Sequence, residues 1–230
     1  MANRKIPFAT GEYYHLYNRG IDKRNVFSNQ KDLNRFFQSM IEFNTTKPIG
    51  SIYENSFVKS GQLGGFTSKL KNKNKKLVNF VAYCLNSNHY HFIIKQTQER
   101  GIEKFMQRLG TGYTMYFNEK EKRSGSLFQG VFKSLHINTN EYLLHLSAYV
   151  NLNDRVHQLG SETSKLVKSS WREYISDDKK DKKEFCKKDI ILGQFRNTED
   201  YKTFAKESLA GILDRRYEKE IPNMKEFLLE

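Results

Sequence analysis

Residues 77–95 read LVNFVAYCLNSNHYHFIIK, a pattern of two apolar runs around a polar triplet. The triplet Asn86-Ser87-Asn88 favours a tight turn, because Asn and Ser side chains hydrogen-bond to nearby backbone groups. The runs on either side, 77–85 and 89–95, have the apolar character of strands. The stretch therefore predicts an antiparallel strand–turn–strand hairpin.

Further elements are predicted on both sides of this hairpin. Residues 12–19, EYYHLYNR, alternate in part and predict a strand that ends at Gly20. Apolar residues at helical spacing predict a helix over 29–43, with Asn29 as its N-cap. Other patterns predict an amphipathic helix over 102–117, strands over 48–58 and 131–137, a helix from Asn138 to about Asn153 with Glu141 at capping-box spacing, and helical structure from residue 190 onward.

These elements together predict the fold class. We expect an α+β fold with an antiparallel sheet of four or five strands and helices mainly on one face. Beyond Gly160 the composition changes, and residues 176–188 are dense in Lys and Asp, as in a solvated connection. We expect one domain over residues 10–158 and a C-terminal helical extension over residues 159–230.

The chain of 230 residues is strongly basic, since 39 Lys and Arg against 26 Asp and Glu give a net charge of +13. Such an excess favours nucleic acid or an anionic membrane as the partner. No run of 18 apolar residues could span a bilayer, and no convincing basic amphipathic helix or lipidation motif is present. Nucleic acid is therefore favoured over a membrane.

Residues 59–76 hold six lysines and no acid, which fits either a solvated loop or a contact with phosphate.

The two cysteines, Cys84 and Cys186, lie far apart and outside any CxxC motif. This spacing excludes a disulfide framework or a zinc ribbon, and it fits a reducing cytoplasm. Residues 1–10 lack the apolar centre of a signal peptide. We expect a cytoplasmic, nucleoid-associated protein.

The triplet His89-Tyr90-His91 carries the most chemical information. Side chains two positions apart in a strand point to the same face, so both imidazoles project together and Tyr90 projects to the other face. Two imidazoles on one face can share a divalent metal ion. The alternative is a structural role, which is the more common one for two histidines at this spacing in a strand.

The predicted helix over 138–153 offers partners for this pair. Tyr149 and Asn153 can face a site on the sheet while apolar residues of the adjacent stripe hold the helix in place. The alternatives are that Tyr149 is a tyrosine at the edge of the core and that Asn153 caps the helix C-terminus. Tyr113 and Tyr116 fit a core role better, because they lie on the apolar face of their own helix. One stripe of the 138–153 helix holds Tyr142, His145, Tyr149 and Asn153.

The stretch VAYCLNSNHYHFIIK, residues 81–95, resembles the His–hydrophobic–His (HUH) motif of the single-tyrosine transposases, and most of all their REP-associated branch. Further segments resemble phrases of this family in the same order: 14–27, 113–134, 141–154, and the pair 169–175 and 185–195. The resemblance implies a ferredoxin-like HUH core. It also implies metal-dependent cutting and rejoining of single-stranded DNA beside DNA hairpins through a 5′-phosphotyrosine, as in transposition or in mobilisation of repeated palindromes.

The resemblance also assigns roles to particular residues. His89 and His91 match the two metal-binding histidines, and Tyr149, in the phrase AYVNLN, matches the nucleophile. Asn153 matches the third metal ligand, and the metal implied is Mg²⁺ or Mn²⁺.

Three positions depart from the pattern of the family. Ser87 stands where Pro is usual, Val131 where Arg is usual, and Asp154 where Pro often follows the asparagine. None of them is one of the four positions implied in chemistry, so these departures bear on DNA preference more than on catalysis.

Polar and basic side chains in two segments are the candidates for DNA binding. Phosphates of a hairpin and of a flanking single strand would bind to such groups, although each also fits a solvated surface residue. The resemblance to a branch with an extra C-terminal segment favours a monomer over a dimer. The candidates are Asn18, Arg19, Lys23 and Arg24 in the first segment and Arg123, Gln129 and Lys133 in the second.

Three other functions compete with this interpretation. A replication initiator or relaxase-type nickase would share the HUH chemistry, but it does not match the five segments. A domesticated hairpin-binding protein without catalysis is disfavoured because all four positions implied in chemistry are present. A generic RNA-binding protein is disfavoured because no RNP or KH signature occurs.

Overall fold

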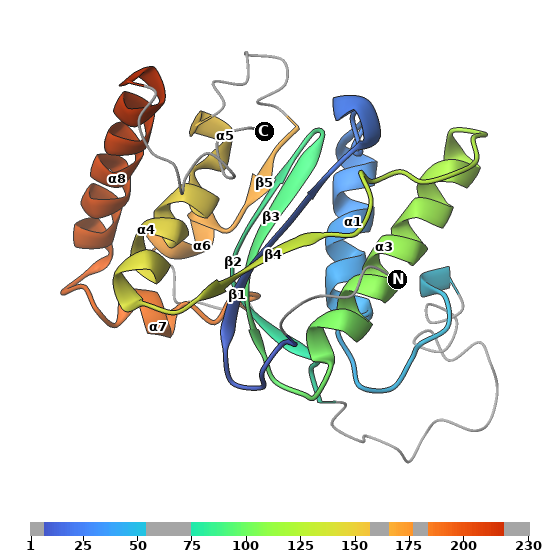
Figure 1. Ribbon diagram of the computed structural model, residues 1–230, viewed down its shortest axis with the longest axis horizontal. Coiled ribbons are helices and arrows are strands. Elements are labelled where there is room, and N and C mark those ends of the chain that lie inside the picture. Colours follow the sequence, from blue (N-terminus) through green and yellow to red (C-terminus); the bar gives the residue numbers. More distant parts are fainter. Residues whose placement is uncertain (1–6, 54–74, 157–165, 177–183, 219–230) are drawn as a thin grey trace.

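The structure, a computed structural model, describes residues 7–53, 75–156, 166–176 and 184–218. Five strands form one sheet in which all neighbouring strands are antiparallel (Figure 1). Their order across the sheet is β4-β1-β3-β2-β5. The predicted α+β class and antiparallel sheet are confirmed. The strands are β1 (Tyr13–Arg19), β2 (Val78–Asn86), β3 (His89–Gln96), β4 (Lys133–Ile137) and β5 (Lys168–Ser169).

The predicted hairpin consists of β2 and β3, joined by a turn at Ser87 and Asn88. The Ser87 carbonyl accepts hydrogen bonds from the backbone N–H groups of Val26 and Phe27 at 2.8 and 2.9 Å. The segment that follows β1 is therefore held against the turn of the hairpin. β1 in turn pairs with β3, so that Arg19 lies opposite His89 and Tyr17 opposite His91.

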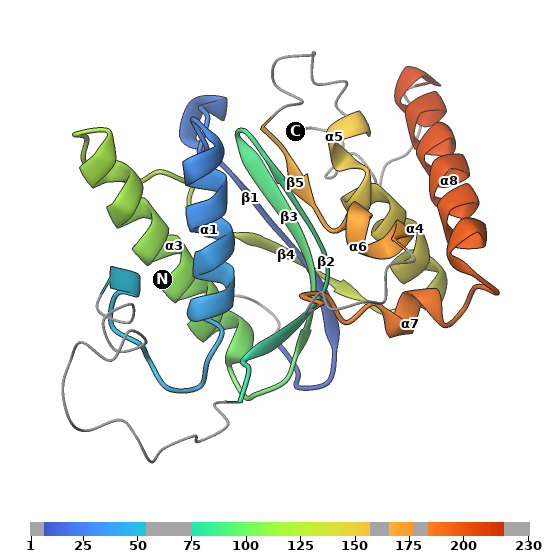
Figure 2. The same ribbon diagram turned by 180° about the vertical axis from the view of Figure 1, so that it is seen from behind.

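Helices cover both faces of the sheet (Figures 1 and 2). We expected helices mainly on one face, and the structure differs because β2 and β3 are apolar on both sides. In β3, Tyr90, Phe92 and Ile94 belong to one core, whereas Ile93 belongs to the other. A strand with two apolar faces requires cover on each of them. The first core lies under α1 (Gln30–Glu42) and α3 (Gly101–Lys120), and the second under α4 (Asn140–Asn151), α5 (Asn153–Val156), α6 (Trp171–Ile175), α7 (Asp189–Leu192) and α8 (Thr198–Glu218).

The local signals at the helix ends were partly correct. The Asn29 side chain caps α1 by accepting a hydrogen bond from the Asp32 backbone N–H at 3.1 Å. The N-cap of α4 is Thr139 rather than Asn138, because its hydroxyl accepts from the Tyr142 N–H at 3.2 Å.

The strand predicted over 48–58 does not occur in its described part, where residues 52–53 are helical. Its remainder lies outside the described residues. So do the lysines of 59–76 except Lys75 and Lys76.

The C-terminal helices are fixed to α4 by a buried polar cluster. The Tyr201 hydroxyl of α8 lies 3.1 Å from Ser147 Oγ and accepts a hydrogen bond from Asn151 Nδ2 at 2.9 Å. Ser170 Oγ donates to Asn151 Oδ1 and accepts from the Tyr83 N–H of β2. Buried polar groups that are fully paired favour one arrangement of the elements they join. This cluster therefore holds α4, the helix that carries Tyr149, at a defined position on the sheet.

None of the described helices has the length and apolar character that crossing a bilayer requires.

Candidate active site

His89 and His91 lie at the end of β3 that follows the hairpin turn, and both are buried. Their ring centroids are 5.2 Å apart and the rings are nearly perpendicular, at 87°. The predicted placement of both imidazoles on one face is correct, and this is the face covered by α4.

The hydrogen-bond partners of His89 fit the tautomer that carries its proton on Nδ1. The Nε2 atom lies 2.8 Å from Asn86 Nδ2, and an amide nitrogen can only donate. His89 Nε2 is therefore the acceptor, and Nδ1 donates to Asn88 Oδ1 at 2.6 Å. Burial lowers the pKa of His89 to about 4, so the ring is neutral at physiological pH. A neutral imidazole with its Nε2 lone pair facing the site is the form that binds a metal.

Asn153 reaches the same point from the other side of the site. Its Oδ1 lies 3.0 Å from His89 Nε2 and accepts a hydrogen bond from Asn86 Nδ2 at 2.6 Å. Its Nδ2 is buried and has no hydrogen-bond partner among the described residues. The helix predicted to run to Asn153 is interrupted at Leu152, where α4 ends and α5 begins. Asn153 is therefore neither on a continuous stripe with Tyr149 nor a simple helix cap.

These atoms fit a divalent metal ion. In the tautomer with the proton on His89 Nδ1, His89 Nε2 and Asn153 Oδ1 are both acceptors, and their contact at 3.0 Å places two lone pairs against each other. Adjacent ligands of a metal are separated by about 3.0 Å when each ligand lies about 2.1 Å from the ion. Within the described ranges, no three His, Cys, Asp or Glu side chains gather as a metal site, so an amide oxygen would have to complete the ligand set. His89, His91 and Asn153 could hold such an ion.

Tyr149 lies on α4 directly above the histidines. Its ring meets His91 edge-on, with centroids 5.5 Å apart at 84°. The two competing tyrosines lie on the opposite side of the sheet. Tyr113 donates to the Val26 carbonyl at 2.7 Å, and Tyr116 donates to Asp32 Oδ1 at 3.0 Å. The structure thus brings together Tyr149, His91, His89 and Asn153 and separates them from the core tyrosines.

His15 also belongs to the site, although it is not among the residues predicted from the sequence. This fully buried residue of β1 lies with its Nε2 3.0 Å from His91 Nδ1, and the two rings are stacked. Burial lowers the pKa of His15 to about 3, so it is neutral as well. The bond occupies Nδ1 of His91, and a metal would accordingly be bound through Nε2. A pattern in the sequence could have indicated His15: it alternates with Tyr17 and Arg19 in the predicted strand, which places all three side chains on one face.

Two of the predicted DNA-binding residues lie beside the histidines. Arg19 is opposite His89 in the sheet, and its charge contributes to lowering the pKa of His89. Lys133 Nζ lies 5.6 Å from the centre of the Tyr17 ring, which itself stacks 5.7 Å from His91. Both cations are thus placed where an anionic group near the histidines would be stabilised.

Lys23 and Arg24 are exposed in the turn after β1, beside the hairpin that bears His89. The turn contains the short 3-10 helix Ile21–Lys23, and Asn88 Nδ2 donates to the Lys23 carbonyl at 3.3 Å. Asp22 and Lys23 both adopt left-handed backbone angles, with φ of 53° and 59°. Such angles are unfavourable for residues other than glycine and often occur at binding sites.

The other three predicted DNA contacts are arranged differently. Asn18 is buried, donates to the Gly130 carbonyl and accepts from the Arg19 N–H, so its side chain stabilises the fold. Arg123 donates to Asn118 Oδ1 and to the Ser126 carbonyl, which holds the loop after α3. Gln129 is exposed and close in sequence to the strand that carries Lys133.

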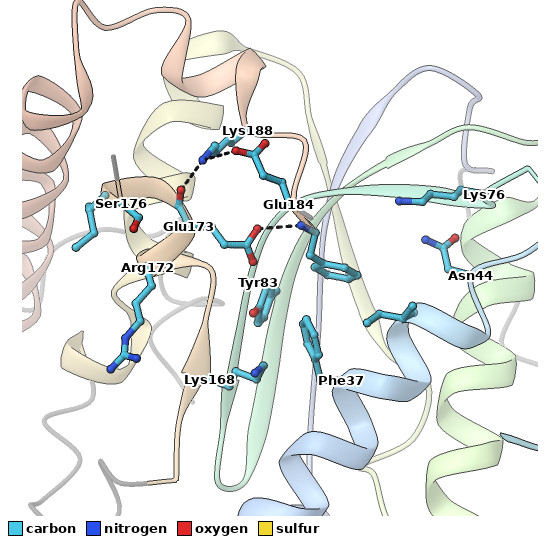
Figure 3. A pocket seen from close by; sticks show the side chains of 13 residues that line it. Phe37, Asn44, Lys76, Tyr83, Lys168, Arg172, Glu173, Ser176, Glu184 and Lys188 are labelled. Atoms are coloured by element: carbon cyan, nitrogen blue, oxygen red, sulfur yellow. Dashed lines mark hydrogen bonds and ion pairs between the residues drawn. The ribbon is translucent and has the colours of Figure 1, made fainter. Parts of the chain in front are cut away.

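A cavity of about 920 Å³ lies between α1, β2 and α6 (Figure 3). It contains aromatic and basic residues, but none of the predicted site residues lines it. Two of its cations are engaged within the lining: Lys188 pairs with Glu184 at 3.0 Å, and Lys168 lies 4.5 Å from the centre of the Phe37 ring. The histidine cluster is therefore the better candidate for chemistry.

Comparison with known proteins agrees with this choice. Residues 64–153 match the family model of the IS200-like transposases. The matched segment covers less than half of the chain, but it contains His89, His91, Tyr149 and Asn153. Within it, the chain is similar to transposases.

One solved structure, of a REP-associated tyrosine transposase bound to a REP hairpin, is also similar. It shares 11% identity, and the comparison covers 76% of this chain and 86% of that chain with a TM-score of 0.48. No curated protein matches the chain.

Proposed function

We propose that the protein is a metal-dependent endonuclease and strand transferase that acts on single-stranded DNA beside DNA hairpins. One observation carries the proposal: Tyr149 packs edge-on against His91, and His89 Nε2 and Asn153 Oδ1 approach to 3.0 Å within the same chain. The IS200-like match over the same residues supports it.

Three side chains would hold Mg²⁺ or Mn²⁺: His89, His91 and Asn153. The ion, when bound, supplies a Lewis acid that offsets the negative charge of the phosphodiester under attack. The protein groups orient the ligands: Asn88 fixes the proton on His89 Nδ1, and His15 engages Nδ1 of His91. Both arrangements direct Nε2 of each imidazole to the ion.

Tyr149 is the proposed nucleophile. Its hydroxyl oxygen loses a proton and forms a bond to phosphorus, while the bond from phosphorus to the 3′ oxygen breaks and that oxygen takes up a proton. The products are a 5′-phosphotyrosine and a free 3′-hydroxyl. Attack of another 3′-hydroxyl on the phosphotyrosine reverses these steps and rejoins DNA without ATP.

Binding of DNA is proposed to involve two groups of residues. Arg19 and Lys133 would bind the phosphate that reacts and its neighbours, since both flank the histidines. Lys23 and Arg24, in the exposed turn beside the hairpin, would bind more distant phosphates. We propose a monomer as the acting unit, on the basis of the resemblance to a branch with an extra C-terminal segment.

The test is incubation of the protein with labelled single-stranded DNA from the flanks of its gene, followed by a denaturing gel. Nicked DNA and a protein-linked fragment are expected with Mn²⁺ or Mg²⁺ and absent with excess chelator. Binding of hairpins without nicking would instead favour the non-catalytic hairpin-binding protein. Cleavage that persists in the chelator would overturn the metal site.

A further inference from the structure

Asn86 is a fully buried polar residue that none of the proposed roles uses. Its position in the triplet Asn86-Ser87-Asn88 suggested a turn residue, but the structure makes it the last residue of β2. Its amide points at the candidate metal ligands: Nδ2 lies 2.6 Å from Asn153 Oδ1 and 2.8 Å from His89 Nε2.

The three polar atoms form a nearly regular triangle. Its sides are 2.6 Å from Asn86 to Asn153, 2.8 Å from Asn86 to His89 and 3.0 Å from His89 to Asn153. Three ligands on one face of an octahedral site with Mg²⁺ have sides of about 3.0 Å, since each lies about 2.1 Å from the ion. The Asn86 amide therefore occupies the corner of a ligand triangle, presenting its nitrogen in this structure.

An amide can exchange its nitrogen and oxygen by rotation about the last torsion of the side chain. In the present orientation Nδ2 donates to both His89 and Asn153, which offsets the contact between their lone pairs. Among the described residues, the Oδ1 atom accepts a single weak hydrogen bond, from Cys84 Sγ at 3.6 Å. Rotation of the amide would therefore break a weak hydrogen bond at Oδ1 and the two hydrogen bonds that Nδ2 donates. A bound cation would then face the lone pairs of His89 Nε2 and Asn153 Oδ1 in place of the two N–H groups.

We infer that Asn86 is a further metal ligand, whose amide oxygen turns toward the ion when the ion binds. The inference rests on the proposed metal site of His89, His91 and Asn153 and extends it with a second amide oxygen. Oxygen ligands favour Mg²⁺ and Mn²⁺ over softer ions, so Asn86 would increase the preference of a histidine pair for these two metals.

A purely structural role for Asn86, as a donor that holds Asn153 in place, makes a different prediction. Asn86→Asp keeps an oxygen at this corner but cannot donate at neutral pH. As a metal ligand, the carboxylate should bind Mn²⁺ more tightly than the amide. As a lost donor, it would leave Asn153 and His89 facing a buried negative charge, and Mn²⁺ affinity would stay the same or fall.

The experiment is titration of the metal-free protein with Mn²⁺, followed by the electron paramagnetic resonance signal of the free ion. We expect affinity about tenfold higher for Asn86→Asp and about tenfold lower for Asn86→Leu than for the wild type. Asn151→Asp is the matched control: Asn151 is equally buried but bonds to Ser170 and Tyr201, and its affinity should be unchanged.

Melting temperatures provide a second measurement if a variant is unstable without metal. Mn²⁺ should raise the melting temperature of Asn86→Asp more than that of the wild type. Wild-type binding with no gain in Asn86→Asp by either measurement would overturn the role of Asn86 alone. Absence of Mn²⁺ binding by the wild type would instead overturn the proposed metal site itself.

Discussion

Substitution of His15 by Phe tests whether the buried histidine of β1 positions His91. Phe keeps a ring in contact with both Tyr17 and His91. It removes the hydrogen bond of 3.0 Å between His91 Nδ1 and His15 Nε2, in which His91 Nδ1 donates when its Nε2 faces a metal. Loss of one partner from a buried hydrogen bond costs about 1–3 kcal/mol. If this cost falls on the orientation of His91, Mn²⁺ affinity should decrease by about 5- to 150-fold.

The assay combines nicking of single-stranded DNA over a range of Mn²⁺ concentrations with urea unfolding of the metal-free protein. The variant should need more Mn²⁺ for half-maximal nicking and should approach the wild-type rate at saturation. His145→Phe serves as the control, because His145 lies on the same helix as Tyr149 but bonds to Ser208 at 2.9 Å, away from the site. An unchanged Mn²⁺ requirement in a folded His15→Phe protein would refute the positioning role.

Three further predictions concern the nucleophile, the first turn and pH. Tyr149→Phe should keep hairpin binding near the wild-type level and lose both nicking and the covalent adduct, which mass spectrometry should map to Tyr149 in the wild type; an adduct elsewhere would contradict the assignment. Gly20→Ala should lower the free energy of unfolding by about 2 kcal/mol in urea titrations, since a Cβ there would lie 2.2 Å from the Arg24 carbonyl oxygen; equal stability would contradict this reading of the turn. Burial lowers the folded pKa values of His15 and His89 to about 3 and about 4, below their usual 6.5, so the unfolded chain takes up protons that the folded chain does not. The metal-free protein should therefore be most stable above pH 6.5 and lose up to about 1.4 kcal/mol per pH unit and histidine below it, with a shallower loss in His15→Phe.

Local patterns in the sequence were sufficient for most of the elements, although not for residues 52–53, and for the placement of His89, His91 and Tyr149. The alternation of side chains placed His89 and His91 on one face, and helical spacing placed Tyr149 on a face toward the sheet. The break at Leu152 was not predictable from spacing, because it depends on how α4 meets the sheet. The resemblance nevertheless pointed to Asn153, which reaches His89 from the start of α5.

Other features depend on pairing between distant strands. His15 meets His91 only because β1 and β3 are neighbours in a particular register, and no local pattern specifies that register. The triplet Asn86-Ser87-Asn88 predicts a turn because Asn and Ser favour turns, whereas Asn86 is the last residue of β2. The side chains of Asn18 and Arg123 donate to the backbone carbonyls of Gly130 and Ser126, contacts that composition alone does not indicate, and their role in DNA binding stays a prediction.

The long sequence separations within the site have a consequence for synthesis of the chain. His15 bonds to a residue 76 positions later, and His89 contacts one 64 positions later. Contacts of this kind form late in folding, because the intervening chain must be closed into loops first. While the ribosome is still synthesising α4, His15, His89 and His91 have already been made. Tyr149 and Asn153 are not yet available to complete the site. The proposed nicking of DNA is therefore expected to begin only once the chain has been made well past residue 153.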